Sequence, residues 1–507
     1  MKIRNFLLFV FFISLSGCKD DRNEADIQKS ELTSFIFKKE NNAKLSWDIT
    51  CDIKDNTITA RISHLTSADG LVPSFSGSFS QVEVDGEIQH SGISSQNFNN
   101  IINYKVISKN GTEHFYQVII KTYSGIPIVK IETENKLEIV SKEDYVNGYI
   151  SISKTPDFDS GFEGPMHIRG RGNATWESYP KKPYRIKLDE KSEILGMPAD
   201  KDWVLLAEYC DKSMIRNACS FELSQLVGLP WTPRYRHVEV FLNGEYNGVY
   251  MLCEHVKVAK NRANIEDDGY LIENDNYWDR EPMWFTTERT GVHYTFKYPD
   301  TDDFSEGDET YNFIKNYMDA FENALFGSNF KNADQGYRKY ADARYFAKWY
   351  LLQEALGNID TNPYYVLESR SGKLKMYPVW DFEWSLGLAA AGTEGWAKPP
   401  VVSPVDKFYR KDRYFSRMFE DPYFTNIIKE EWRVMKEERL PVLKENVKNK
   451  AESLKYAQKN NFNRWEILGE YTSVGLTKFE TWQEEVDYAV DFLNKRIVWL
   501  DSEIQKL

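Results

Sequence analysis

Two hydrophobic patterns divide the chain. From residue 31 to 124, short stretches alternate apolar and polar positions, and turn pairs such as Asp55-Asn56 and Asn110-Gly111 separate them. Alternation with a period of two between closely spaced turns is typical of antiparallel strands in a β-sandwich. The expected strands lie at 44–49, 57–62, 81–84, 103–107 and 115–122. We therefore predict a small all-β domain and, because it carries no catalytic constellation, interpret it as a spacer.

The pattern from residue 126 to 507 is mixed. Strand-like stretches prevail in its first half, at 166–168, 184–188, 203–207, 238–242 and 249–253. Helical periodicity follows, with apolar residues at steps of three or four from Tyr311 to Leu325 and again over 345–356. Two further helices are expected at 423–456 and 477–504. A β-rich half followed by a helical half predicts an α+β domain.

The N-terminus has the pattern of a secretory signal peptide over residues 1–17. Lys2 and Arg4 precede an apolar run from Phe6 to Leu15, which is the arrangement that directs export. The run is shorter than the roughly 20 apolar residues that a membrane-spanning helix needs. We therefore expect this segment to be removed after export.

Residues 18–30 are predicted to form a lipidated tether. Leu15-Ser16-Gly17-Cys18 resembles the bacterial lipobox, in which the cysteine becomes the N-terminus and carries lipid. Several acyl chains on Cys18 would hold the protein to a membrane, and Lys19-Asp20-Asp21 is similar to the acidic export signal of Bacteroidetes surface lipoproteins. We expect a lipid-anchored protein of the outer membrane, displayed at the cell surface. The alternative is an ordinary cleaved signal with an incidental cysteine.

Charge and cysteine content bear on partners and cross-links. The chain has 64 basic and 77 acidic side chains and a net charge of -13, so its field repels nucleic-acid backbones and no nucleic-acid partner is expected. The cysteines beyond the tether show no metal-binding spacing; they are Cys51, Cys210, Cys219 and Cys253. Isolated buried thiols are the simplest interpretation, with a Cys210–Cys219 disulfide as the alternative in an exported protein.

The segment most informative about chemistry is a predicted hairpin. Strand-like runs flank the polar turn Ser369-Arg370-Ser371-Gly372, which is typical of two paired strands. The turn centres at position 370.5, which is also the midpoint of Asp360 and Asp381. Residues equidistant from a hairpin turn face each other with Cβ atoms about 5 Å apart. The two carboxylates are therefore expected to meet at the open end of the hairpin.

Paired carboxylates at this distance point to a cation. Like charges repel unless one is protonated or a cation offsets them. Glu383, two residues after Asp381, adds oxygen ligands of the kind that Mg²⁺ prefers. The spacing alone leaves a solvated loop with two unrelated acids as an equal alternative.

Three weaker signals precede the hairpin. A strand-like run enters a turn containing Gly170 and Gly172, whose backbone amides could approach a phosphate closely. Lys187 lies on the polar face of the alternating stretch 184–188, where it could pair with phosphates or simply face solvent. A helix at 215–226 carries Glu222, either a partner for Lys187 or an ordinary exposed glutamate.

The order of these parts is the order found in protein kinases. Five segments together resemble the spore-coat protein CotH kinase family: GRGNATW at 170–176, KKPYRIKL at 181–188, DKSMIRN at 211–217, YNGVYMLCEHV at 246–256 and WDFEWSLG at 380–387. The likeness implies an atypical protein-kinase-like domain over 126–507. It would be preceded, over 31–124, by an Ig-like sandwich similar to those of Bacteroidetes surface lipoproteins.

The resemblance also implies a function, namely the use of ATP and Mg²⁺ to phosphorylate Ser or Thr of exported proteins. By position, Asp360 is the expected catalytic base. The residues expected to bind the cofactors are Lys187, Gly170, Gly172, Glu222 and Glu254 for ATP and Asp381, Glu383 and Asn362 for Mg²⁺. The family commonly has an aspartate where Glu383 stands.

Two other functions stay open on the sequence. Glycoside hydrolysis needs two acids about 5 to 10 Å apart, which Asp360 with Asp381 or Glu383 would supply. A non-catalytic surface protein would instead use the kinase-like scaffold to bind a glycan or protein ligand, and exposed Trp clusters would favour it. Serine hydrolases and zinc peptidases are excluded, because the sequence has neither G-x-S-x-G nor H-E-x-x-H.

Overall fold

The computed structural model describes residues 31–64, 66–154, 159, 161–360, 362–389, 391–392, 395–396, 404–408, 413–472 and 477–507. The chain divides into two compact units between Thr122 and Tyr123. The predicted signal peptide and the tether with Cys18 lie outside the described residues. In the part of the chain that is described, no helix is long and apolar enough to cross a membrane.

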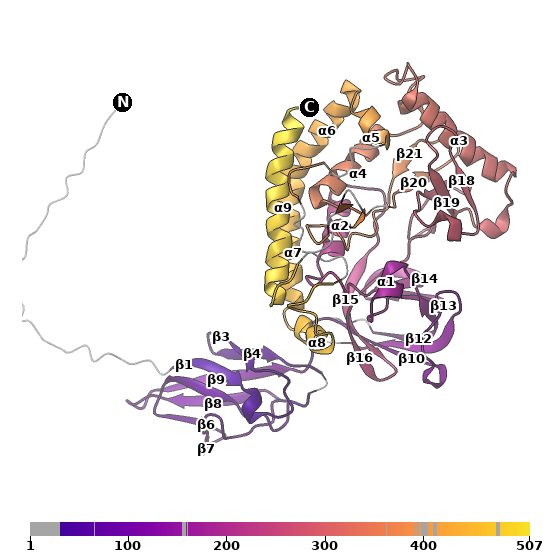
Figure 1. Cartoon of the computed structure of the whole chain (residues 1–507). Helices are drawn as coiled ribbons and strands as arrows, with labels where there is room; N and C mark the ends of the chain where they lie inside the picture. The colour runs from indigo at the N-terminus through magenta and orange to yellow at the C-terminus, as the bar shows by residue number, and fades with distance from the viewer. Residues whose placement is uncertain are drawn as a thin grey trace, which may run out of the picture. The chain divides into compact units, whose positions relative to one another are not determined.

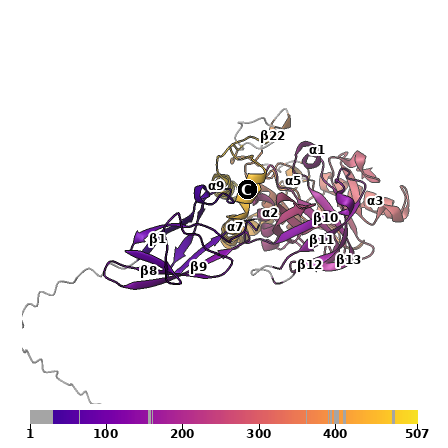
Figure 2. The same cartoon turned by 90° about the horizontal axis from the view of Figure 1, so that it is seen from below.

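The first unit is all-β. It contains a three-stranded sheet in the order β2-β1-β5 and a six-stranded sheet in the order β3-β4-β9-β8-β6-β7, in which Figure 2 shows β8 and β9 side by side. A separate apolar core that includes Phe35, Phe37 and Tyr104 fills the unit. The strands are β1 (Glu31–Phe37), β2 (Ile49–Thr50), β3 (Asp52–Lys54), β4 (Thr57–Arg61), β5 (Ser74–Ser78), β6 (Gln81–Val84), β7 (Glu87–Ile88), β8 (Ile102–Ile107) and β9 (Glu113–Lys121).

Alternation located four of these strands and missed the others. Four of the five predicted stretches coincide with β4, β6, β8 and β9. The stretch 44–49 is wrong, since the residues before Ile49 form turns that bury Leu45 without a strand partner. Strand β5 gave no signal because its sequence, SFSGS, is as rich in serine and glycine as a loop.

The second unit begins with a closed barrel of seven strands in the order β10-β11-β12-β13-β14-β16-β15. Strands β10 and β15 pair in parallel and close the ring, whereas the other neighbours are antiparallel. Fully buried side chains such as Ile131, Ile168 and Trp203 fill its interior, so the barrel is a packed core. The strands are β10 (Ile128–Thr133), β11 (Val146–Ile152), β12 (Phe162–Gly170), β13 (Tyr184–Ile194), β14 (Met197–Leu206), β15 (Tyr235–Leu242) and β16 (Glu245–Glu254).

A five-stranded sheet and the α-helices complete this unit (Figure 1). The sheet has the order β18-β19-β17-β20-β21 and comprises β17 (Tyr270–Glu273), β18 (Trp284–Thr286), β19 (His293–Tyr298), β20 (Tyr364–Leu367) and β21 (Leu374–Met376). The helices are α1 (Ala174–Ser178), α2 (Arg216–Leu226), α3 (Glu309–Phe326), α4 (Ala343–Leu356), α5 (Arg413–Met418), α6 (Pro422–Val434), α7 (Leu440–Leu454), α8 (Ala457–Arg464) and α9 (Trp482–Gln505). A two-stranded sheet pairs β22 (Ala391–Gly392) with β23 (Gly395–Trp396). The architecture is therefore mixed α+β, as the pattern predicts.

The helix predicted over 423–456 is not continuous. Helix α6 ends at Val434, residues Met435–Arg439 form a π-helical turn, and α7 begins at Leu440. Pro441 cannot donate the backbone hydrogen bond that an uninterrupted α-helix needs at its position. Apolar periodicity carries through such a turn, so the sequence pattern did not reveal the break.

Arg496 on α9 forms a buried ion pair with Glu354 on α4, with 2.6 Å between Nη2 and Oε2 and neither side chain exposed. We expect Arg496→Ala to lower the free energy of unfolding of the second unit by about 3–5 kcal/mol, because it removes the guanidinium that pairs with the buried Glu354 charge. The neighbouring Lys495→Ala removes an exposed pair with Asp491 and should cost about 1 kcal/mol or less. Urea unfolding monitored by tryptophan fluorescence measures both, and equal losses would contradict the prediction.

Candidate functional site

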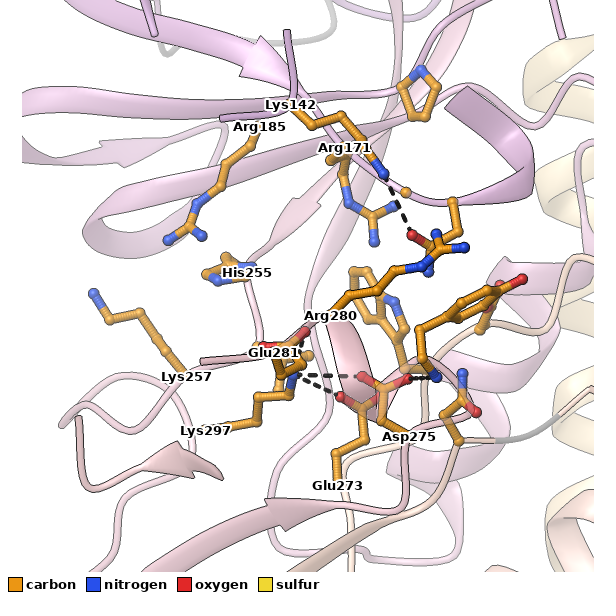
Figure 3. A pocket seen from close by; sticks show the side chains of 18 of the residues that line it. Lys142, Arg171, Arg185, His255, Lys257, Glu273, Asp275, Arg280, Glu281 and Lys297 are labelled. Carbon is orange, nitrogen blue, oxygen red and sulfur yellow. Dashed lines mark hydrogen bonds and ion pairs between the residues drawn. The ribbon is translucent and has the colours of Figure 1, made fainter. Parts of the chain in front are cut away.

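A cleft of about 1330 Å³ lies between the barrel and the five-stranded sheet (Figure 3). Charge is segregated across it. The barrel and its loops contribute five basic side chains, Lys142, Arg169, Arg171, Arg185 and Lys187, against two acidic ones. The opposite side contributes seven acidic side chains, Glu273, Asp275, Glu281, Asp300, Asp360, Asp381 and Glu383, against three basic ones. One face thus suits an anion and the other a cation.

The turn from Gly170 to Asn173, here called the glycine turn, brings backbone to the barrel side of the cleft. A Cβ on Gly170 would lie 2.5 Å from the ring of Trp176 on α1. Gly172 has φ +83°, and a Cβ there would lie 2.4 Å from Thr175 Oγ1. Only glycine fits at either position. The two glycines are therefore required for the shape of the turn.

Two cations on the barrel side, Lys187 and Arg171, form no ion pair with a carboxylate among the described residues. Arg185 and Lys187 lie on the face of β13 opposite the buried Tyr184 and Ile186, as alternation predicts. Arg185 pairs with Asp202 at 3.1 Å. Within the described ranges, however, neither Lys187 nor Arg171 has a carboxylate at ion-pair distance, and the Arg171 guanidinium lies 5.4 Å from the ring centre of Trp380. These two cations are available to an anionic ligand.

The pKa values of Asp202 and His255 reflect the positive charge on the barrel side of the cleft. Burial alone would raise the pKa of Asp202, but its hydrogen bond from Lys257 and the charges of Lys257 and Arg185 bring that pKa down to about 2. Burial, reinforced by Arg185 and Arg171, holds the pKa of His255 well below its usual value. His255 therefore lines the cleft as a neutral ring.

The hairpin has the predicted register. Tyr365 faces Met376, so the pairing of β20 with β21 centres at position 370.5. The ladder ends at Met376, and Asp360 and Asp381 lie beyond it in two loops that both line the cleft. Asn358 connects these loops: its Oδ1 accepts from the Asp360 N–H at 3.3 Å, and its Nδ2 donates to the Asp381 carbonyl at 3.3 Å. A side chain, not the ladder, thus joins the two segments.

Asp381 and Asn362 offer oxygen atoms to a metal ion. Solvent reaches Asp381 through the cleft, and its φ is +62°. The surrounding protein raises its pKa by limiting hydration, and the charge of Arg171 opposes that shift. Asn362 Oδ1 is buried and has no hydrogen-bond partner in the described part of the protein. Two such oxygens fit a magnesium ion that takes its other ligands from phosphates and water.

Among the described residues, the protein does not supply a complete set of metal ligands by itself. Over the described ranges, no group of three His, Cys, Asp or Glu side chains could hold a metal ion. Glu383, expected as a third ligand, lines the cleft but is only 8% exposed. Its Oε1 accepts from the backbone N–H of Cys210 at 3.2 Å and from Sγ at 3.0 Å. Burial, reinforced by Asp211 and Glu208, raises the pKa of Glu383 to about 7 despite these bonds.

Two residues predicted to bind the nucleotide do not line the cleft. Glu222 accepts from Tyr235 Oη at 2.8 Å and Asn446 Nδ2 at 2.7 Å, so the expected pair with Lys187 is wrong. Glu254 is fully buried and accepts from Arg234 at 2.9 Å and Arg262 at 2.7 Å. The expectation for Glu222 rested on the order of elements and that for Glu254 on the family resemblance, and neither reveals the direction of a side chain.

The DKSMIRN segment has a positioning role that sequence reasoning missed. Asp211 forms a fully buried ion pair with Arg216, whose Nε donates to the Ser385 carbonyl at 2.9 Å. Asn217 Oδ1 accepts from the Phe382 N–H at 3.0 Å. The start of α2 therefore holds the segment that carries Asp381.

The cysteines in the described part of the chain are free, buried thiols: Cys51, Cys210, Cys219 and Cys253.

A cluster of carboxylates on the acidic side was also missed. Lys297 Nζ lies 3.1 Å from Glu273, 3.8 Å from Asp275 and 3.3 Å from Glu281. Burial raises the pKa of Glu273 to about 7, although the charge of Lys297 works against it. These residues come from β17, β19 and the connection between them. Because they are separated in the sequence, no local motif predicts that they form a cluster.

Aromatic rings cluster on the segments next to the cleft residues Tyr277 and Arg280. Trp278 stacks on His293 with ring centres 4.0 Å apart and meets Trp284 edge to face at 4.2 Å. Trp284 is 37% exposed and the neighbouring Tyr277 36%. Exposed, mutually packed rings of this kind are typical of binding surfaces.

Comparison with known proteins identifies one family. The family described as CotH kinase protein matches residues 168–500, well over half of the chain. No curated protein matches the chain. Among solved structures, the crystal structure of a candidate glycoside hydrolase from Bacteroides thetaiotaomicron aligns with 55% of this chain and 77% of its own, at 13% identity and a TM-score of 0.16. A TM-score that low supports no conclusion about fold or function.

The raised pKa of Glu383 predicts a pH-dependent stability. The folded protein keeps this proton up to about pH 7, whereas the unfolded chain loses it near its ordinary pKa, so the contribution to stability is present at pH 4 and is lost as pH rises to 7. When the pH is raised from 4 to 8, the free energy of unfolding of Glu383→Gln should therefore rise by about 2–3 kcal/mol relative to that of the parent. Urea unfolding at both pH values tests this, with the exposed Glu138→Gln as control. An equal effect of Glu383→Gln at both would refute it.

Proposed function

Because the chain belongs to the CotH family over residues 168–500, we propose that it is an atypical protein kinase that transfers phosphate from ATP, with Mg²⁺, to Ser or Thr of exported proteins. The observation that carries this proposal is the segregation of charge across the cleft. The glycine turn with Arg171 and Lys187 faces Asp360 and Asp381. Phosphoryl transfer needs this combination of cations for phosphates and carboxylates for a metal ion and a hydroxyl.

The barrel side would bind the nucleotide. The side chains of Lys187 and Arg171, beside the glycine turn, would neutralise the phosphates. Asp381 and the unpartnered Oδ1 of Asn362 would hold Mg²⁺. When bound, this ion neutralises charge on the phosphate oxygens.

Asp360 would act on the acceptor. It orients the hydroxyl of the Ser or Thr and takes its proton as the phosphoryl group is transferred. Asn358 fixes the backbone on which Asp360 lies, through the bond to its N–H. Catalysis in such a site comes mostly from positioning and charge neutralisation.

The location follows from the sequence alone. In this proposal, residues 1–17 are removed on export, lipid on Cys18 anchors the protein to the outer membrane, and the enzyme meets a protein or glycan substrate at the cell surface. The segment Leu15-Ser16-Gly17-Cys18 supports the anchor, and Lys19-Asp20-Asp21 supports surface exposure. The first unit is then a spacer between the lipid and the catalytic unit.

A second function is favoured by the aromatic rings next to the cleft. The exposed Trp284 packs against Trp278, and the adjacent Tyr277 is exposed, as expected of a non-catalytic surface protein that binds a glycan or protein ligand. In that case the scaffold would be kept for binding, and the cleft would transfer no phosphate.

Mg²⁺-ATP should stabilise the full chain against thermal unfolding. A ligand at about 100 times its dissociation constant contributes about 2.7 kcal/mol. Asp381→Asn should lose most of this gain, because it removes the carboxylate proposed to hold the ion. The exposed Asp334→Asn serves as a control and should keep the gain. If the parent shows no shift, the binding-protein function takes precedence.

Asp360→Asn should abolish transfer while leaving nucleotide binding intact. Loss of a general base lowers kcat by about 100-fold or more, and the phosphates do not depend on this side chain. Incorporation of labelled phosphate into a generic acceptor protein, measured beside the thermal shift, separates the two effects. Unchanged incorporation would show that Asp360 is not the base.

A further inference from the structure

Arg280 crosses the cleft from the acidic side to the basic side. It ends the 3₁₀ turn Trp278–Arg280 between β17 and β18 and lines the cleft. Its Nη1 lies 3.8 Å from Oε1 of Glu177 on α1, the helix that follows the glycine turn. Figure 3 shows the side chain extending toward the region of Lys142 and Arg171. Arg280 therefore reaches the place where the phosphates of a ligand would lie.

The contact between Arg280 and Glu177 is weak. At 3.8 Å, with side chains 54% and 60% exposed, such a pair contributes little and exchanges partners easily. The other cations on the same side are held more firmly: Lys257 lies 2.7 Å from Asp202, and Lys297 lies 3.1 Å from Glu273. Among the described lining residues of that side, Arg280 is thus the cation least committed to a protein partner.

The guanidinium is also oriented in advance. It lies over the ring of Tyr277, 4.5 Å from the ring centre. Stacking covers the flat face of the group and leaves its in-plane N–H donors open. Those donors match two phosphate oxygens at once, a geometry that a lysine cannot offer. The site is therefore suited to an oxyanion.

We propose that Arg280 is a phosphate-binding residue. When a polyphosphate lies at the glycine turn, Arg280 leaves Glu177 and binds the phosphates from the side opposite Arg171 and Lys187. The ligand then joins the two walls of the cleft. This inference rests on the proposed function and deepens it, since it assigns to Arg280 recognition of phosphate rather than of adenine or the acceptor. Glu177 holds the arginine in place until the ligand arrives.

Calorimetric titration of the full chain tests this with three probes: Mg²⁺-ATP, inorganic tripolyphosphate and adenosine. Arg280→Ala should raise the Kd for ATP and for tripolyphosphate at least about tenfold, which is the loss of one charge-assisted contact. The Kd for adenosine should not change. Arg280→Lys should fall between parent and Arg280→Ala, because charge remains but the paired donors are lost. The exposed Arg289→Ala is the matched control and should bind like the parent.

A double-mutant cycle with Glu177→Gln separates ligand binding from a purely structural latch. If Arg280 contacts phosphate, Arg280→Ala weakens ATP binding as strongly in the Glu177→Gln background as in the parent. Glu177→Gln alone then leaves the Kd unchanged or lowers it. If the loss disappears in that background, or if Glu177→Gln weakens binding as much as Arg280→Ala does, the assignment is overturned.

The outcomes also distinguish this inference from the proposed function. Tight ATP binding that is indifferent to Arg280→Ala refutes the inference alone. If tripolyphosphate binding depends on Arg280 and ATP binds no more tightly than tripolyphosphate, Arg280 is a phosphate-binding residue but the proposal that the ligand is a nucleotide is refuted. A parent protein that binds neither ATP nor tripolyphosphate refutes both.

Discussion

The ion pair between Asp211 and Arg216 holds in place the segment that carries Asp381 on the acidic side of the cleft. Both side chains are fully buried, and desolvation of two charges is costly unless further hydrogen bonds complete the network. Here they do, since Arg216 also donates to the carbonyls of Ser385 and Leu386. The arginine thereby holds a loop that has no regular secondary structure of its own. Together with the bonds from Asn358 and to Asn217, this network holds Asp381 in position opposite the glycine turn.

A second buried pair extends the same support to the C-terminal helix. Lys212, next to Asp211, lies 2.8 Å from Glu485 on α9, and neither side chain is exposed. Its ammonium also donates to the carbonyls of Glu470 and Thr477. The start of α2 is thus joined to the loop of Asp381 on one side and to α9 on the other. Buried charges must meet their partners, so they permit fewer packing arrangements than apolar side chains do. We infer that these buried pairs select one arrangement of the three segments.

The sequence was most informative where structure is local. Alternation placed Lys187 on the correct face of β13, and the midpoint of the turn gave the register of β20 with β21. It was least informative where side chains from distant segments meet. Nothing near Lys297 indicates that Glu273 and Glu281 surround it, and nothing near Glu383 indicates that it turns to Cys210. These contacts depend on how whole elements pack, which no short-range pattern encodes.

Closure of the barrel has a mechanical consequence. Because β10 pairs with β15, hydrogen bonds run around the complete ring, and the wall that carries the glycine turn cannot splay as an open sheet can. The chain leaves or re-enters this ring at 207–215, 227–234 and 255–269. Helix α8 restrains it further, since Asn461 accepts from the N–H of Val249 at 3.0 Å. A change in the width of the cleft must therefore come from movement of the whole barrel relative to the five-stranded sheet, since the barrel wall does not open by itself.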